Sequence, residues 1–503
     1  MDIRRAALSG LIFLGLASVG AAAEVFDIGL STVGTRIDAM AVPATRRDAP
    51  VVVLLGSLQS DAQSSTDVIT TVTRFEALRN RPVRLIAVPR PNPEARPLSF
   101  PPTGVAYSEN AEANTLWRWL GAQAPDLVLV AGQDDAGLVD ALGSQPVAHM
   151  GRIPARVWTG DATALAALAA TPRSEARTER LRREARSPRE LATQLARRYG
   201  HDFDQPWYIG ALALVARIEL GDIDDVRRLV ESWVNGSKDS LARPNSLVMA
   251  GHVVFSELAR RTQDSRYIDA VRKVAELGFD PQGAMREAMP YHEQYSDSVF
   301  MGTAIVAQAG SLTGERRYYD MADRHLRFME SLDLRADGLY RHQPAADAAW
   351  GRGNGFAALG LAMSLAELPQ DHPGHAHALE AYRHLMDALL PHQTRDGLWR
   401  NVVDVPGAYA EFSSTAMIGY ALQRGLRAGW IRGTRYKAAA DRAWQAVNAR
   451  SGADGSFIDV CESTTRLTSV QQYVQRAAIL GEDARGGAMA LLFATERMKA
   501  SPR

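Results

Sequence analysis

The stretch Trp350-Gly351-Arg352-Gly353-Asn354-Gly355-Phe356 says most about the fold and function of this chain of 503 residues. Glycine inside a helix costs about 1 kcal/mol relative to alanine, yet these glycines lead straight into a strong helix pattern over residues 356–368. Glycines at a helix start let backbone and ligand approach closely. Arginine pairs bidentately with a carboxylate, and tryptophan offers a flat face to a sugar ring. The stretch therefore indicates a site for an acidic sugar, although Trp350 could instead be a core residue.

The overall composition is that of a globular enzyme. Hydrophobic residues make up 46% of the chain and charged residues 23%, and Lys+Arg and Asp+Glu both number 57, so the formal net charge is zero. A balanced charge argues against nucleic acid as a partner. Attraction for an acidic substrate must then come from a few local arginine and histidine side chains. The length fits two or three domains.

Residues 1–23 have the pattern of a signal peptide. Arg4-Arg5 precede a short apolar run over residues 8–19, and Ala21-Ala22-Ala23 offer a cleavage site. The run is short for a membrane span, so we expect a periplasmic or secreted protein without a membrane anchor after cleavage. An uncleaved anchor is the alternative. Cys461 is the only cysteine, so an intramolecular disulfide is impossible, and we expect Cys461 in the core.

Residues 24–165 are predicted to form an α/β domain. Apolar runs of strand length occur at 51–55, 83–88 and 127–130, with a helix pattern over 111–120. Strands buried on both faces favour a parallel sheet.

Residues 166–190 are predicted to be a charged linker. Seven arginines lie between positions 173 and 189, interleaved with glutamates. A solvated linker helix is the interpretation we favour, with first cleavage there in limited proteolysis. A polyanion-binding patch is the alternative, weakened because the glutamates cancel much of the charge.

Residues 191–503 are predicted to be almost wholly helical, with a weak internal repeat. Similar turns at 262–267, 313–318 and 432–436 each end in a tyrosine and open an amphipathic helix. Repeated helical hairpins over 300 residues predict an α/α toroid, with an open solenoid as the alternative.

Polar residues that could carry chemistry stand near the predicted helix starts. Asp297 precedes an apolar run and could be a helix cap or a catalytic acid. His342 could be a structural histidine, and Glu411 with Ser413 could form another cap. The eleven histidines are scattered and no HExxH motif occurs, so we expect neither a metal nor a cofactor.

These residues resemble the motifs of the unsaturated glucuronyl and rhamnogalacturonyl hydrolases, glycoside hydrolase families 88 and 105. The shared features over residues 200–497 are Asp297 with Met301, the Trp-x-Arg-Gly-Asn-Gly segment at 350–355, the helix start at 411–417, and Tyr473, Arg476, Gly481 and Asp483. The resemblance implies that residues 191–503 form an (α/α)6 barrel. It also implies an acidic oligosaccharide substrate, from whose non-reducing end a 4,5-unsaturated uronic acid is removed by hydration of its double bond.

The resemblance also assigns roles to individual residues. Asp297 would be the catalytic acid. The expected substrate-binding residues are His252, His292, His342, Trp350, Arg352, Glu411, Ser414, Tyr473 and Arg476, with Arg352 or a histidine near the substrate carboxylate. Many family members carry a second aspartate that residues 245–252 lack. Either His252 or Ser246 replaces it, or Asp297 acts alone.

Two other functions stay open on the sequence. One is another (α/α)6 carbohydrate enzyme, either an ordinary glycosidase or a polysaccharide lyase. The other is a glycan-binding protein without catalysis. The aglycone and the oligomeric state are left undefined.

The N-terminal domain has a weaker resemblance to zinc carboxypeptidases. It covers residues 51–60, Arg90-Pro91-Asn92-Pro93 and residues 111–120. Those enzymes need histidine and glutamate ligands soon after the first strand, and residues 56–62 contain neither. A degenerate scaffold or a glycan-docking domain is the resulting expectation.

Overall fold

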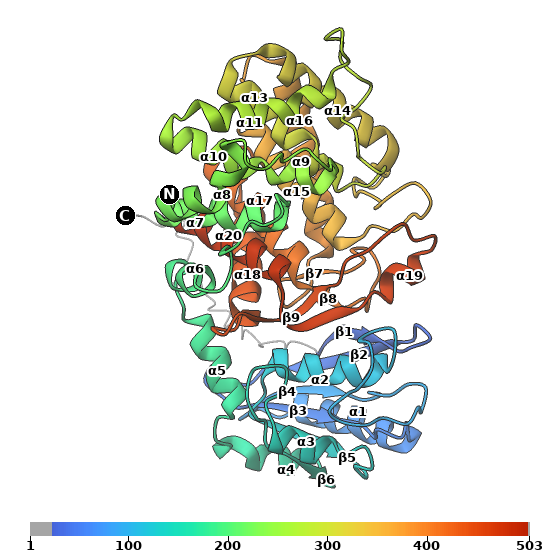
Figure 1. Cartoon of the computed structure of the whole chain (residues 1–503). Coiled ribbons are helices and arrows are strands. Elements are labelled where there is room, and N and C mark those ends of the chain that lie inside the picture. Colours follow the sequence, from blue (N-terminus) through green and yellow to red (C-terminus); the bar gives the residue numbers. More distant parts are fainter. Residues whose placement is uncertain (1–22, 501–503) are drawn as a thin grey trace, which may run out of the picture.

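The computed structural model describes residues 23–500 and shows a sheet domain beneath a larger helical domain (Figure 1). The predicted signal peptide lies, apart from its last residue, outside the described residues. Among the helices between residues 23 and 500, none has the length and apolar character needed to cross a membrane.

The sheet domain contains a six-stranded mixed sheet with the order β1-β2-β4-β3-β5-β6. Its strands are β1 (Glu24–Leu30), β2 (Arg36–Val42), β3 (Val51–Leu55), β4 (Arg84–Val88), β5 (Leu127–Ala131) and β6 (Ala155–Trp158). Strands β4, β3, β5 and β6 are parallel, which confirms the parallel sheet predicted from the apolar runs. β1 and β2 add an antiparallel edge that the sequence analysis missed. β1 is mostly exposed or half-buried and so carries no continuous apolar run.

Helices cover both faces of this sheet. α1 (Ala62–Glu76) and α4 (Ala162–Ala166), which continues into η1 (Ala167–Ala170), pack on one face. α2 (Ala111–Gln123) and α3 (Leu138–Ser144) pack on the other. Ile458 of the helical domain belongs to the same core as α2. The two domains therefore share buried apolar surface.

The helical domain is a closed double ring. Within the described residues, the inner ring runs through six helices that contact one another in turn: α7 (Tyr208–Leu220), α10 (Val253–Thr262), α13 (Thr303–Thr313), α15 (Gly351–Leu365), α17 (Phe412–Ala428) and α20 (Ala484–Met498). α20 contacts α7 and closes the circle. This closure confirms the toroid and rules out the open solenoid.

The outer ring packs around it. Its helices are α6 (Pro188–Ala196), α8 (Ile223–Val234), α11 (Ser265–Ala275) with η2 (Glu276–Gly278), α14 (Arg316–Asp333), α16 (Pro373–Leu389) with η3 (Leu390–His392), and α18 (Thr434–Arg450). Short elements occupy the loops: α9 (Ser246–Gly251), α12 (Ser298–Met301), α19 (Val470–Val474), β7 (Trp399–Arg400), β8 (Ala410–Glu411), β9 (Ser456–Cys461) and β10 (Ala478–Glu482).

The internal repeat marks contacts between neighbouring outer segments. Each repeated turn opens an outer helix, α11, α14 or α18, with an Arg-Tyr pair in its first turn. The arginine binds a carboxylate of the preceding outer segment in all three cases: Arg266 with Glu231, Arg317 with Glu276 and Arg435 with Asp387. Tyr318 and Tyr436 donate to the same carboxylates as their arginines. The repeat is therefore a recurring ionic contact that fixes the spacing of the outer ring.

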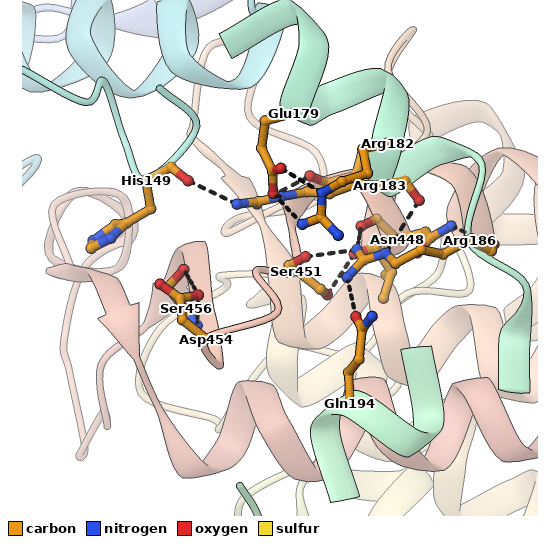
Figure 2. A network of polar contacts seen from close by, with 12 residues as sticks. His149, Glu179, Arg182, Arg183, Arg186, Gln194, Asn448, Ser451, Asp454 and Ser456 are labelled. Carbon is orange, nitrogen blue, oxygen red and sulfur yellow. Dashed lines mark hydrogen bonds and ion pairs between the residues drawn. The ribbon is translucent and has the colours of Figure 1, made fainter. Parts of the chain in front are cut away.

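The predicted linker is not a single solvated helix. It contains α5 (Glu175–Glu184) and the start of α6, with a capping box at Ser187 and Glu190. Arg183 and Arg186 are buried. Figure 2 shows Arg183 donating to the carbonyl of His149, and Arg186 to those of Asn448 and Ser451. Because these arginines dock the segment against both domains, preferential proteolysis there is no longer expected.

Gly360 fixes the distance between α12 and α15. A methyl group at this position would lie 2.3 Å from the Val299 carbonyl oxygen and 2.5 Å from the Phe300 Cα. Backbone atoms cannot rotate away, so we expect Gly360→Ala to lower the free energy of unfolding by about 1–3 kcal/mol, as overpacked cores do. Urea denaturation measures the loss. Gly143→Ala in α3, where no atom lies within 4 Å of the added methyl, is the matched control, and an equal effect of both changes would contradict the prediction.

Candidate active site

The candidate site lies where the inner helices begin. Asp297 precedes α12, Trp350 precedes α15, Glu411 precedes α17, and His252 precedes α10. These four residues thus precede helices, as the sequence predicted for the candidate residues. Helix N-termini carry positive dipole ends, which favour a negatively charged ligand at this end of the barrel.

Asp297 does not cap its helix. It has helical backbone angles, and its side chain makes no capping hydrogen bond to α12. Its Oδ1 is buried and has no hydrogen-bond partner among residues 23–500, while the side chain as a whole is 17% exposed. The three left-handed residues Tyr291, Glu293 and Gln294 shape the loop before it. The carboxyl is thus withheld from the backbone and left partly open to a substrate.

The glycines of the opening stretch bring protein segments together. α15 begins at Gly351, not at the predicted residue 356, so these glycines lie inside the first turns of the helix. A methyl group at Gly353 would lie 2.6 Å from Ser296 Oγ and 3.7 Å from Asp297 Oδ1. Gly353 therefore lets the loop that carries Asp297 approach α15. The sequence analysis expected these glycines to make room for a ligand.

Among residues 23–500, His342 is the basic side chain that lies within 4 Å of the Asp297 carboxyl. Its Nε2 lies 3.7 Å from Asp297 Oδ1, and its Nδ1 lies 2.7 Å from the Tyr473 hydroxyl. Tyr295 stacks on the imidazole with ring centres 4.5 Å apart, and Trp350 meets it edge-on at 4.6 Å. These contacts leave the histidine one orientation, with Nε2 toward Asp297.

Trp350 and Arg352 are buried behind the site and hold its backbone and His342 in place. Trp350 is 2% exposed and donates from Nε1 to Asn401, so the predicted stacking face for a sugar is covered. Arg352 is also 2% exposed, lies over the Trp350 ring at 4.9 Å, and donates to the carbonyls of Cys461 and Glu462 at 2.6 and 2.7 Å. Arg352 is therefore not in the open position that its glycine neighbours suggested, because its guanidinium is buried and donates to two backbone carbonyls.

Burial sets the protonation states around the acid. It raises the pKa of the Asp297 carboxyl to about 7, although the positive charge of Arg352 opposes the rise. Burial, together with Arg352, lowers the pKa of His342 to about 3. Burial raises the pKa of the Tyr473 hydroxyl to about 12. At neutral pH the site therefore holds a neutral histidine, a neutral tyrosine and a carboxylic acid that is substantially protonated.

This arrangement predicts the pH dependence of catalysis. A general acid must be protonated to act, so kcat/KM should fall about tenfold per pH unit above the Asp297 pKa of about 7. Initial rates on a fixed substrate between pH 5 and 9 measure the descending limb. An Asp333→Asn variant is the control, because that buried carboxyl also has a raised pKa. If the fall of kcat/KM with rising pH disappears in Asp333→Asn, the titrating group is not Asp297. A fall centred near pH 4 in the parent protein would also contradict the assignment.

Other predicted site residues have structural contacts. Glu411 caps α17 by accepting from the amides of Ser413 and Ser414, and it also accepts from the Cys461 amide. Ser414 is buried and bonded back to the Glu411 carbonyl. The cap that we had kept as the alternative is thus confirmed, and the Glu411 carboxyl is occupied by backbone donors.

Three further predicted residues have contacts elsewhere in residues 23–500 and none with the Asp297 side chain. His252 is buried between Ser240 Oγ and the Val248 carbonyl, and burial lowers its pKa to about 4. His292 packs against Phe328, and Arg476 donates to the Ser463 carbonyl. His252 therefore has both ring nitrogens engaged and does not stand in for a missing aspartate.

The sequence analysis missed several members of the site. Tyr295 stacks on His342, and Asn401 links the Trp350 indole to the Tyr473 carbonyl. Asp333 is fully buried at the end of α14, both its oxygens lack a partner within the described chain, and burial raises its pKa to about 8. Tyr295 could have been found from the sequence, because it lies two residues before Asp297. Asn401 and Asp333 lie on other segments, and nothing in the sequence around them indicates that they belong to the site.

Across residues 23–500, no group of three or more His, Cys, Asp or Glu side chains is placed to hold a metal ion. A carboxylic acid with a raised pKa, partly open and held beside a neutral imidazole, is equipped to deliver a proton to a bound ligand.

Comparison with known proteins agrees with this geometry. Residues 201–501 match the family model for Glycosyl Hydrolase Family 88. Protein Atu3128 of Agrobacterium fabrum is 34% identical over 166 residues, which cover 30% of this chain and 71% of that protein. The unsaturated rhamnogalacturonyl hydrolase YesR of Bacillus subtilis is 24% identical over 241 residues, which cover 44% of this chain and 70% of YesR.

Solved structures show the same architecture. A possible member of the GH105 family from Salmonella enterica superposes with a TM-score of 0.54 and 18% identity, covering 63% of this chain and 95% of that one. The similarity supports the (α/α)6 toroid. The family match begins at residue 201, so the resemblance of the sheet domain to carboxypeptidases stays a prediction.

Proposed function

The chain belongs to Glycosyl Hydrolase Family 88, and from this premise we propose that it removes 4,5-unsaturated uronic acid from the non-reducing end of oligosaccharides left by polysaccharide lyases. The observation that carries the proposal is the Asp297 carboxyl. It is partly exposed, free of capping bonds, and has a pKa of about 7. The family resemblance supplies the class of substrate.

The proposed reaction is hydration of a vinyl ether. Asp297 gives its proton to C4 of the double bond, and positive charge develops at C5 and the ring oxygen. Water adds to C5 and returns a proton to the Asp297 carboxylate, which restores the acid. The bond from C5 to the ring oxygen then breaks, giving a ketone at C5, and the exposed hemiacetal at C1 releases the rest of the sugar. One acid serves both proton transfers.

His342 is proposed to position the acid. With the Tyr473 hydroxyl donating to Nδ1, the ring proton is on Nε2 and faces Asp297 Oδ1 at 3.7 Å. A neutral imidazole in this place orients the carboxyl without taking its proton, because burial lowers the pKa of His342 to about 3. The proton of Asp297 is then available to the substrate.

The alternative of an ordinary glycosidase requires two cooperating carboxyl groups across the scissile bond. Asp333 is close enough for its charge to be influenced by Asp297, but it is fully buried. A group without solvent contact is poorly placed to hold a water or attack a sugar. The chemistry of a single acid therefore fits the site better than cleavage by a carboxyl pair.

The decisive experiment separates these enzymes by substrate. Purified protein is incubated with lyase digests of pectin, glycosaminoglycan and glucuronan, and the ultraviolet absorbance of the unsaturated uronate is followed. Loss of absorbance in one digest supports the proposal and identifies the aglycone class. Release of sugars from the saturated chains with the absorbance intact would identify an ordinary glycosidase, and binding without turnover would indicate a glycan-binding protein.

We further propose that the protein acts in the periplasm or outside the cell. The support is the pattern of Arg4-Arg5, the apolar run over residues 8–19 and the alanines before Glu24. N-terminal sequencing of the protein from fractionated cells tests it. A start at Glu24 in the exported fraction is expected, and an intact Met1 in the cytoplasm would contradict it.

A further inference from the structure

Two adjoining cavities on the sheet domain are lined by arginines. One has a volume of about 350 Å³ and the other about 460 Å³, and they share Arg46, Arg47, Ala49 and Arg177 in their walls. Both volumes lie in the range of small-molecule sites. Their arginines come from four parts of the chain: the loop after β2, strand β4, the start of α5 with the segment before it, and the loop after η3 of the toroid. The first cavity includes Arg395 of the toroid and so lies where the two domains meet, and the second adjoins it on the sheet domain beside α5.

The walls of the cavities carry an excess of positive charge. They contain six arginines, Arg46, Arg47, Arg84, Arg173, Arg177 and Arg395, against Glu24, Asp48 and Asp126. The three acids are engaged: Asp48 pairs with Arg46, Glu24 with Arg395, and Asp126 accepts from the amides of Val51 and Ser174. Four arginines therefore remain available to a ligand.

The sequence alternative of a polyanion patch at 173–189 was weakened by the interleaved glutamates, and the structure shows which arginines they neutralise. Glu179 binds Arg182 and Arg183, Glu184 binds Arg180, and Glu175 binds Arg152. Figure 2 shows Arg183 and Arg186 directed into the domain junction. Arg173 and Arg177 are left out of this pairing.

Arg84 and Arg177 are the strongest indicators of a site for an anion. Neither has a carboxylate within 4 Å anywhere in residues 23–500, and both are half-buried. Burial lowers the pKa of each guanidinium, and Arg180 and other neighbouring arginines add to the effect. Holding like charges together in a half-buried wall is unfavourable without an anion, and guanidiniums match carboxylates with two parallel hydrogen bonds.

We propose that these cavities form a second carbohydrate-binding site that takes the carboxylates of an acidic polysaccharide chain. The choice of a uronate chain over other anions rests on the proposed function. A chain carries one carboxylate per uronate unit, and Arg47, Arg84, Arg173 and Arg177 offer several guanidiniums across the two adjoining cavities. The sheet domain would then hold polymer near the enzyme that consumes its fragments, which gives this domain a role separate from the catalytic acid.

The test is direct binding of a saturated oligogalacturonate by calorimetry to the whole protein. This probe has no unsaturated end, so binding is independent of turnover. We expect the Arg84→Gln/Arg177→Gln variant to bind about tenfold more weakly or worse, because each charge-assisted bond contributes substantially. The matched control is Arg182→Gln/Arg228→Gln, which loses the same charge from side chains that are 49% and 73% exposed and already paired. We expect the control to stay within about twofold.

The outcomes separate this proposal from the proposed function. Binding of oligogalacturonate that only the first variant loses supports the site, even if no unsaturated uronide is turned over. Turnover of unsaturated uronides with equal binding in both variants overturns it. Competition by inorganic phosphate or by a short DNA duplex at the same concentration as oligogalacturonate also overturns it, because the site would then be a general anion site. If the double variant does not fold, Arg47→Gln, on an exposed loop, replaces it.

Discussion

Asp297→Asn should lower turnover of an unsaturated uronide by about 10²–10⁴-fold, the usual contribution of a general acid. Asparagine keeps the size of the side chain but has no proton of suitable acidity. Stability should not suffer, because the Asp297 side chain makes no capping bond and its Oδ1 has no partner within the described residues. Steady-state rates and thermal melting of the same preparation measure both quantities.

The ionisation of Asp297 should also make the stability of the protein depend on pH. The folded pKa of Asp297 is raised from 3.8 to about 7, so ionising this group opposes folding. The penalty is absent below about pH 4, grows as the pH rises, and is complete above about pH 7. At pH 8 the asparagine variant should therefore melt at the same temperature as the parent protein or higher. A variant that retains near-parental rates would remove Asp297 from the mechanism.

Arg352→Met should destabilise the protein by about 2–4 kcal/mol, because it leaves the carbonyls of Cys461 and Glu462 without their charged donor. It should also move the descending limb of the pH profile to higher pH, since the positive charge of Arg352 lowers the pKa of Asp297. Chemical denaturation and pH-dependent rates measure the two effects separately. This revises the interpretation from sequence, in which Arg352 bound the substrate.

The control for Arg352 is a lysine. Arg352→Lys keeps the charge but loses the planar fork, so stability should fall while the pH limb stays near its original position. If Arg352→Met instead melts like the parent and only raises KM, Arg352 faces the substrate and its buried contacts do not matter for folding. A shift of the limb to lower pH would likewise contradict the electrostatic role.

Much of the fold could be read from the sequence because its signals are local. Apolar runs identified β3, β4 and β5, and the turns before Tyr267, Tyr318 and Tyr436 identified outer helices. The strands β1, β2 and β6 escaped because each has exposed or half-buried positions and so carries no continuous apolar run. The linker prediction failed for a related reason: Arg183 and Arg186 are buried by partners more than 260 residues away in the chain.

The site was only partly predictable. The motifs brought Asp297, His342, Trp350, Arg352 and Tyr473 to one place, as expected. Their roles were not all foreseen, since Trp350 and Arg352 are enclosed by Asn401, Cys461 and Glu462. Asn401 and Asp333 could not be found at all, because neither has a neighbour in sequence that marks it.

The sequence by itself determined the central parallel strands, the helical character of residues 191–503 and the position of the acid before an apolar helical run, because periodicity and short motifs encode them. The tertiary structure decided which acid is free to react. Asp297 and Glu411 both precede an apolar helix, yet the Glu411 carboxylate already accepts hydrogen bonds from the backbone amides of Ser413, Ser414 and Cys461. Asp297 is left without such donors in a buried wall. Hydrogen-bond partners and desolvation set the pKa of a carboxyl, and both depend on segments that only folding brings together.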